Sequence, residues 1–208
     1  MKRNITTPFL LLTLVGTTLL FGFSAPRLDS PGLDSPRQDD PKPGEKKIKW
    51  MTIEQAFAEN TKTPKKIFID VYTDWCGWCK VMDQKTFTHP AIIDYINEHY
   101  HAVKLNAEQR ENITLGLQTF KYVDQGGRGV HELAVALLKG QMSYPTTVFL
   151  DEKGQMIQPL PGYLEPRMAH QILTYFGGGH NAKESFDAYK TGTYVKEYQP
   201  AMPVPAGQ

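Results

Sequence analysis

The chain has 208 residues, and its basic and acidic side chains nearly balance, with a formal net charge of +1 at pH 7. That length suits a single domain with attached segments. The near-neutral charge gives no electrostatic reason to expect a nucleic acid or an acidic substrate, so partners must be inferred from particular residues.

The first 25 residues have the pattern of an export signal. Lys2 and Arg3 precede an apolar stretch over residues 9–23. This stretch is short for a bilayer span of about 20 residues, so the pattern favours a cleaved signal peptide over 1–25 and an exported, periplasmic protein of bacterial type. Phe23 stands where cleavage prefers a small residue. An uncleaved inner-membrane anchor is therefore the alternative, and membrane contact is expected only in that case.

Residues 26–47 differ in composition from the rest of the chain. They are rich in Pro, Asp and Lys, and they contain the duplicated sequence LDSP at 28–31 and 33–36. Such a segment cannot bury enough apolar surface to form a core. We therefore predict a disordered, solvated linker over 26–47, a folded domain over 48–179 and a C-terminal extension over 180–208.

The folded region alternates helical and strand patterns. Thr52 followed by Gln55 forms a capping box, and Pro90 is typical of the first turn of a helix. The order strand, helix, strand implies parallel pairing through a right-handed crossover, whereas the turn at 151–154 makes the following edge strand antiparallel. In chain order, the predicted elements are a helix over 53–60, a strand over 65–72, a helix to about 87, a helix over 90–100, a strand over 101–106, a helix over 133–138, strands over 146–150 and 155–160, and a helix over 165–176.

The two cysteines of the chain stand three positions apart, at Cys76 and Cys79, shortly after the predicted strand over 65–72. The start of the following helix has unpaired backbone N–H groups and a dipole that favours a thiolate, so Cys76 is the expected reactive sulfur. Helical spacing places Cys79 beside it, so the pair can form and break one disulfide. A disulfide that closes so short a loop would add little stability, which favours redox chemistry over a structural role.

Metal binding is another use of this cysteine spacing. A zinc site needs about four ligands, yet the chain has no second cysteine pair, and none of its six histidines forms an H-x3-H pair. We therefore expect neither a metal nor another cofactor.

The Trp-Cys-Gly-Trp-Cys-Lys motif at 75–80, the Tyr144–Thr146 step before a strand and the order of elements resemble the thioredoxin superfamily. Exported bacterial thioredoxin-like proteins carry the most similar motif. The resemblance covers about residues 50–179. It implies an α/β thioredoxin fold, in which helices flank a central mixed sheet.

The resemblance also implies roles for particular residues. Cys76 would be the attacking thiol, Cys79 the resolving thiol and Pro145 a cis-proline beside them. Asp70 stands where thioredoxins carry a buried carboxylate, and burial would raise its pKa toward the range useful for deprotonating Cys79. The alternative is a solvated Asp70 without a catalytic role. Lys104 in the next strand either pairs with Asp70 or extends to solvent.

A cis X-Pro bond leaves the backbone of the preceding residue free to pair with an extended substrate. Trp78 replaces the proline that is common between the cysteines of thioredoxins, so the motif does not fix the redox potential or the direction of electron flow. The residues expected to contact substrate are Trp75, Gly77, Trp78, Tyr144, Pro145 and Thr146.

These features predict an exported thiol–disulfide oxidoreductase that reduces disulfides in client proteins and receives electrons from a membrane thiol donor. The alternatives are a disulfide oxidase or isomerase, a non-catalytic peptide-binding module and a metal chaperone. Two regions depart from the thioredoxin pattern. The stretch over 109–141, with its glycine-rich turn at 124–129, is expected to be a surface loop near the active face that shapes partner choice. The aromatic residues of the extension are expected to pack back on the domain.

Overall fold

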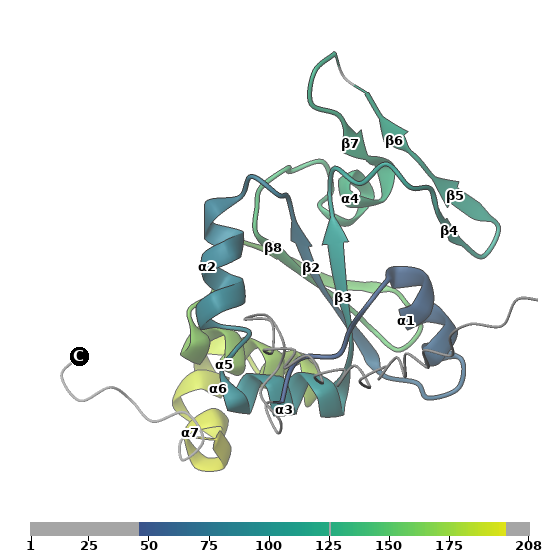
Figure 1. The fold of residues 1–208 in the computed structure, drawn as a ribbon. Coiled ribbons are helices and arrows are strands. Elements are labelled where there is room, and N and C mark those ends of the chain that lie inside the picture. The colour runs from purple at the N-terminus through teal and green to yellow at the C-terminus, as the bar shows by residue number, and fades with distance from the viewer. Residues whose placement is uncertain (1–45, 125, 199–208) are drawn as a thin grey trace, which may run out of the picture. The chain divides into compact units, whose positions relative to one another are not determined.

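The structure is a computed structural model, and it describes residues 46–124 and 126–198 (Figure 1). The predicted signal peptide over 1–25 and all but the last two residues of the predicted linker over 26–47 lie outside the described residues. Within the described ranges, no helix combines the length and the apolar character needed to cross a membrane.

A five-stranded mixed sheet forms the centre of the fold, in the order β1-β3-β2-β8-β9. The first three of these strands are mutually parallel, and β8 pairs antiparallel with both β2 and β9. All but β1 are predicted from the sequence, because the two residues of β1 are too few to show a periodic pattern. The strands are β1 (Trp50–Met51), β2 (Lys66–Tyr72), β3 (Tyr100–Asn106), β8 (Thr146–Leu150) and β9 (Met156–Pro161).

Helices cover both faces of this sheet, because alternate side chains of β2 reach two separate apolar clusters. Ile67 and Ile69 pack with α1 and α4, whereas Phe68 packs with α2, α3 and α5. The predicted capping box is confirmed, since Thr52 and Gln55 each accept the other's backbone N–H. The helices are α1 (Ile53–Asn60), α2 (Gly77–Lys85), α3 (Pro90–His99), α4 (Glu132–Leu137) and α5 (Pro166–Gly177).

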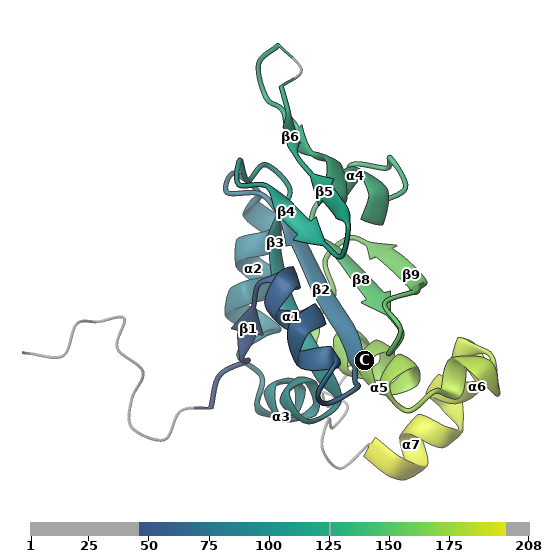
Figure 2. The same ribbon diagram turned by 90° about the vertical axis from the view of Figure 1, so that its right-hand side faces the viewer.

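The stretch predicted as a surface loop contains two small antiparallel hairpins. They are formed by β4 (Ile113–Leu115) with β5 (Gln118–Phe120), and by β6 (Tyr122–Val123) with β7 (Val130–His131). The loop prediction is wrong here because strands of two or three residues are shorter than the runs that identify strands in a sequence. We call residues 113–124 and 126–131 the arm. Figures 1 and 2 show it projecting at the end of the domain opposite α6 and α7.

Residues 180–198 of the C-terminal extension pack on the domain, as the aromatic residues of the extension predict. Residues 199–208 lie outside the described residues. The described part of the extension forms η1 (His180–Ala182), α6 (Phe186–Thr191) and α7 (Thr193–Tyr198). Tyr189 and Tyr194 are fully buried in the same apolar cluster as α3 and α5. The Tyr194 hydroxyl lies 3.0 Å from Nδ1 of the buried His170. The extension therefore contributes directly to the main core.

The chain enters the domain beside α3. The Asn97 side chain accepts a hydrogen bond from the Lys49 backbone N–H and donates one to the Lys47 carbonyl, both at 2.9 Å. The Lys46 ammonium also pairs with Asp94 on the same helix at 2.8 Å. The start of the described chain is thus held against α3 before β1 joins the sheet.

Candidate active site

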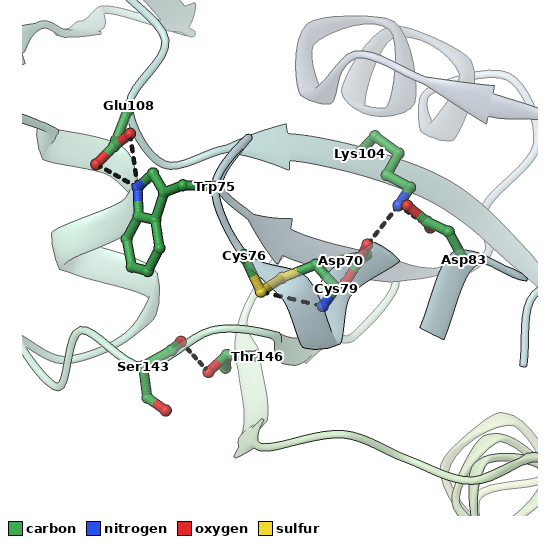
Figure 3. Close-up of a disulfide and its surroundings, with 9 residues drawn as sticks. All are labelled: Asp70, Trp75, Cys76, Cys79, Asp83, Lys104, Glu108, Ser143 and Thr146. Carbon is green, nitrogen blue, oxygen red and sulfur yellow. Dashed lines mark hydrogen bonds and ion pairs between the residues drawn. A yellow bond between two sulfur atoms is a disulfide. The ribbon is translucent and has the colours of Figure 1, made fainter. Parts of the chain in front are cut away.

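The two cysteines lie where β2 passes into α2 and are joined as a disulfide (Figure 3). Cys76 is the N-cap of α2, and its Sγ accepts the backbone N–H of Cys79 at 3.0 Å. Helix starts have N–H groups without an intrahelical partner, and the helix dipole favours negative charge there. The position of Cys76 is therefore suited to hold a thiolate once the bond is reduced.

Asp70 is fully buried in the centre of the sheet, so it is not solvated at a strand edge. It pairs in register with Lys104 of β3 and with Thr147 of β8. The Lys104 ammonium donates to Asp70 Oδ2 at 2.6 Å. Burial raises the pKa of Asp70 to about 6, and the charge of Lys104 limits the rise. An acid in this range can accept and release a proton near neutral pH.

Asp70 is linked through Lys104 to α2, the helix that carries Cys79. Asp83 follows Cys79 by four residues, so the two side chains lie on one face of the helix. Lys104 contacts both Asp70 and Asp83, which places the three charges together, as Figure 3 shows. Among the described residues, Asp70 Oδ1 has no hydrogen-bond partner, and neither does the buried hydroxyl of Thr147. Oδ1 is thus the carboxylate oxygen available to take a proton.

Lys104 is enclosed by aromatic rings as well as by carboxylates. Its Nζ lies 5.0 to 5.3 Å from the ring centroids of Trp50, Tyr72 and Phe87. Burial alone would lower the pKa of Lys104, but the charges of Asp70 and Asp83 and the hydrogen bonds to them together outweigh burial, and the net effect is a raised pKa. Lys104 therefore remains protonated and acts as a fixed positive charge beside Asp70.

The residues expected to contact substrate do not all lie at the surface. The Tyr144–Pro145 peptide bond is cis, and the backbone of Tyr144 has no hydrogen-bond partner in the described part of the chain. Trp75 and Trp78 are 52% and 62% exposed. Thr146 is buried, and its hydroxyl donates to the Ser143 carbonyl at 2.7 Å. This side chain therefore stabilises the loop before β8 and does not face the surface.

Gly77 is the first residue of α2, and a Cβ there would meet no atom within 4 Å. The surface beside the disulfide is therefore open at this position. Trp78 next to it lies against the ring of Tyr163, with 5.4 Å between centroids.

Two further residues reach this site without any signal in the sequence. The indole N–H of Trp75 donates to both carboxylate oxygens of Glu108 at 3.0 Å, and the Arg128 guanidinium lies over the Trp75 ring. Arg128 comes from the turn of the arm. No motif links these positions, because only the fold of the arm brings them together.

The described residues contain no group of three or more His, Cys, Asp or Glu side chains arranged to hold a metal ion. The arrangement that they do show is a dithiol pair, a buried carboxyl group and an exposed aromatic surface. Together these can support thiol–disulfide exchange.

Comparison with known proteins places the chain in a family. The family model Thioredox_DsbH, described as "Protein of unknown function, DUF255", matches residues 42–176. Spermatogenesis-associated protein 20 of Rattus norvegicus is 29% identical over 76 residues, which are 36% of this chain and 10% of that protein. The thiol:disulfide interchange protein DsbD of Pectobacterium atrosepticum is 29% identical over 77 residues, which are 33% of this chain and 13% of that protein. The chain thus spans about a tenth of the length of these curated relatives.

Among solved structures, a thioredoxin-fold protein from Helicobacter pylori is 20% identical, with a TM-score of 0.49, and the match covers 73% of this chain and 91% of that chain. A putative disulphide-isomerase from Bacteroides thetaiotaomicron is 21% identical, with a TM-score of 0.45 and coverage of 66% and 94%. The family model spans well over half of the chain. The chain therefore belongs to the Thioredox_DsbH family of thioredoxin-fold proteins.

Proposed function

We propose that this protein is an exported thiol–disulfide oxidoreductase that reduces disulfides in client proteins. The observation that carries the proposal is the position of Cys76, whose Sγ caps α2 and accepts a backbone N–H. These features favour a thiolate on Cys76 over one on Cys79, which lies inside the first turn. The similarity to a thiol:disulfide interchange protein supports the same chemistry.

The reaction begins with the reduced pair. The Cys76 thiolate attacks one sulfur of a client disulfide, a Cys76–client bond forms, and the other client sulfur leaves as a thiolate. Cys79 then attacks Cys76 Sγ and expels the second client sulfur. The client disulfide gains two electrons and becomes two thiols, while the protein pair loses two electrons and becomes the Cys76–Cys79 bond. A membrane thiol donor would return the pair to its reduced state.

Asp70 would act in the second step as the base for Cys79. Its Oδ1 has no hydrogen-bond partner among the described residues, and its pKa of about 6 leaves the carboxyl mostly ionised at neutral pH. It can therefore accept the Cys79 proton as the new disulfide forms. Lys104 keeps the ionised carboxylate paired, which limits the cost of a buried charge.

The client would bind over the aromatic surface around the pair. Trp75, Gly77 and Trp78 surround the cysteines, and Tyr144 offers backbone groups without a partner in the described chain. An extended client segment can pair with these groups in the manner of an added strand, beside Pro145. In this proposal the signal peptide exports the chain, and the segment over 26–47 separates the domain from the membrane if the signal stays uncut.

Paired cysteine variants of the full chain test the proposal. Cys79→Ala is expected to accumulate client proteins as mixed disulfides on Cys76, detected as bands that disappear on reduction. Cys76→Ala is the matched control and should trap few clients. Trapping through Cys79 instead would show that the roles are reversed, and no trapping by either variant would favour a non-catalytic binding module.

The reduction potential of the pair decides the direction of electron flow. A value near about −270 mV agrees with a reductase, whereas a value of about −120 to −180 mV would indicate an oxidase or isomerase. Equilibration of the full chain with thiol–disulfide buffers gives this value. A bond that resists mild reductant would contradict a redox role.

A further inference from the structure

The arm reaches the residue next to the attacking cysteine. The Cζ of Arg128 lies 4.7 Å from the centroid of the Trp75 ring, and Arg128 Nε lies 3.7 Å from Glu108 Oε1. The same glutamate accepts the Trp75 indole N–H. An exposed tryptophan is thus held in one orientation by two residues of opposite charge, which also neutralise each other.

The surface beside this cluster is hollowed into a groove of about 310 Å³, which we call the arm groove. That volume lies at the lower end of the range for ligand sites, about 300 to 1,000 Å³, so it suits one large side chain better than a cofactor. The side chains that shape it are Glu108, Arg128, Val130, Val135, Met142 and Tyr144.

The exposed lining of the arm groove is more apolar than polar. Val135 of α4 is 36% exposed, and Met142 before β8 is 38% exposed. The charges of Glu108 and Arg128 already face each other. Gly129 completes the wall without a side chain, since a Cβ there would lie 2.4 Å from the Val123 carbonyl oxygen. A polar side chain would therefore gain little binding free energy on entering the groove. An apolar side chain would gain binding free energy, because its surface would be removed from water.

The arm groove adjoins the site of chemistry at two points. Trp75 precedes Cys76 in the chain, and its ring meets Tyr144 edge to face with 5.9 Å between centroids. Tyr144 in turn lines the groove and precedes Pro145. A client joined to Cys76 through a disulfide is held next to this surface by that covalent bond, so its flanking residues lie within reach of the groove.

We propose that the arm groove binds one large apolar side chain of the client polypeptide, in the extended segment that flanks the cysteine attacked by Cys76. This inference rests on the proposed function and names the class of client. The covalent attachment of the client and the free backbone of Tyr144 favour this occupant over a second copy of the chain. The protein would then select unfolded or extended segments that carry an exposed apolar residue near a cysteine.

Model peptides test this selection on the full chain. Each peptide is serine-rich, carries one cysteine in a disulfide with a small thiol, and has a single leucine moved stepwise along either side of the cysteine. We expect leucine at one position to raise kcat/KM about tenfold over serine at the same position, in line with the burial of one large apolar side chain. Equal rates for all peptides would overturn the proposal.

Substitutions in the arm groove test whether the preference for leucine arises there. Met142→Asp and Val135→Asp are each expected to lower the ratio of kcat/KM for the leucine peptide to that for hydroxyethyl disulfide by about tenfold. Val195→Asp in α7 is the matched control, because Val195 is 38% exposed and lies outside the groove. A leucine preference that survives in both groove variants would show that the leucine binds elsewhere.

A binding measurement separates the groove from the redox proposal. The same peptides with serine in place of cysteine cannot react, and binding is followed through the Trp75 indole N–H resonance of the oxidised protein, one of three indole signals. A leucine-dependent shift that disappears in Met142→Asp supports the groove even if no disulfide is reduced. Reduction of hydroxyethyl disulfide without such a shift or a peptide preference would retain the redox function and overturn the groove.

Discussion

Replacement of Asp70 by asparagine is expected to make the protein more stable. Burial raises the pKa of the Asp70 carboxyl from 3.8 to about 6. Each pH unit between the unfolded and folded pKa values corresponds to about 1.4 kcal/mol, so the ionised carboxyl lowers the free energy of unfolding by about 3 kcal/mol above pH 6. Asparagine carries no charge, and Lys104 keeps its contact with Asp83. We therefore expect Asp70→Asn to raise the free energy of unfolding by about 1 to 3 kcal/mol at pH 8.

The gain has a defined dependence on pH. Because the pKa of Asp70 in the folded state lies above its unfolded value, protonation of Asp70 stabilises the folded protein. That contribution is complete below the unfolded pKa of 3.8 and is lost as the pH rises through about 6. The wild type loses stability over this interval because Asp70 becomes ionised inside the folded protein, whereas the asparagine of the variant does not titrate. The difference between the two proteins should be small near pH 4 and largest above pH 7.

Urea unfolding of both oxidised proteins across this pH range measures the difference. Asp83→Asn is the control, because it removes the other carboxylate that contacts Lys104 but leaves the buried charge of Asp70 in place. It should give no gain at pH 8. A difference between wild type and Asp70→Asn that does not change with pH, or a loss of stability at pH 8, would refute the reasoning.

The same substitution should slow the proposed second step of the reaction. Without a base, Cys79 must lose its proton unaided, so release of a trapped client should slow more at pH 7 than at pH 9. Stopped-flow measurements of client release at the two pH values give the comparison. An equal loss of rate at both would mean that Asp70 has only a structural role.

Substitutions at three further positions probe other parts of the structure. Tyr194→Ala removes a fully buried ring and should lower the free energy of unfolding by about 3 to 5 kcal/mol. Tyr194→Phe removes only the hydroxyl beside His170 and should lower it by about 1 to 2 kcal/mol. Equal losses of the two variants in urea unfolding would contradict this division. Gly129→Ala brings a Cβ against the Val123 carbonyl and should displace the arm, seen as a shift of the Trp75 indole N–H resonance; an unmoved signal would mean that the arm does not hold the indole. Thr147→Val removes a buried hydroxyl that has no partner in the described chain and should leave stability unchanged or raise it by up to about 1 kcal/mol, and a clear loss would reveal a partner.

The sheet and most helices are predictable because their signals are local. The capping box at Thr52 and Gln55 and the apolar run of β2 each lie within a few residues of the chain. The cysteine pair is predictable for the same reason, since its spacing alone indicates a dithiol. Burial of Asp70 also follows from its apolar neighbours in a central strand.

The surroundings of Trp75 are not predictable in this way. Trp75 and Glu108 stand 33 positions apart, and Arg128 comes from a turn between strands of two residues each. The contact depends on how two short hairpins fold against the end of β3, where the His131 N–H donates to the Ala107 carbonyl at 2.8 Å. The hydrophobic periodicity of a sequence cannot predict such an arrangement, because the arrangement arises from tertiary packing rather than from a repeating pattern.

The attachment of the entering chain to α3 has a mechanical consequence. A pull on the preceding residues would load the two Asn97 hydrogen bonds and the short pairing of β1 with β3. These contacts lie at the edge of the sheet, whereas Asp70 belongs to the fully paired strand β2. Tension along a tether would therefore detach the edge strand before it distorted the strand that leads to the cysteines. A domain held in this way can be anchored from its N-terminal side without strain on its dithiol.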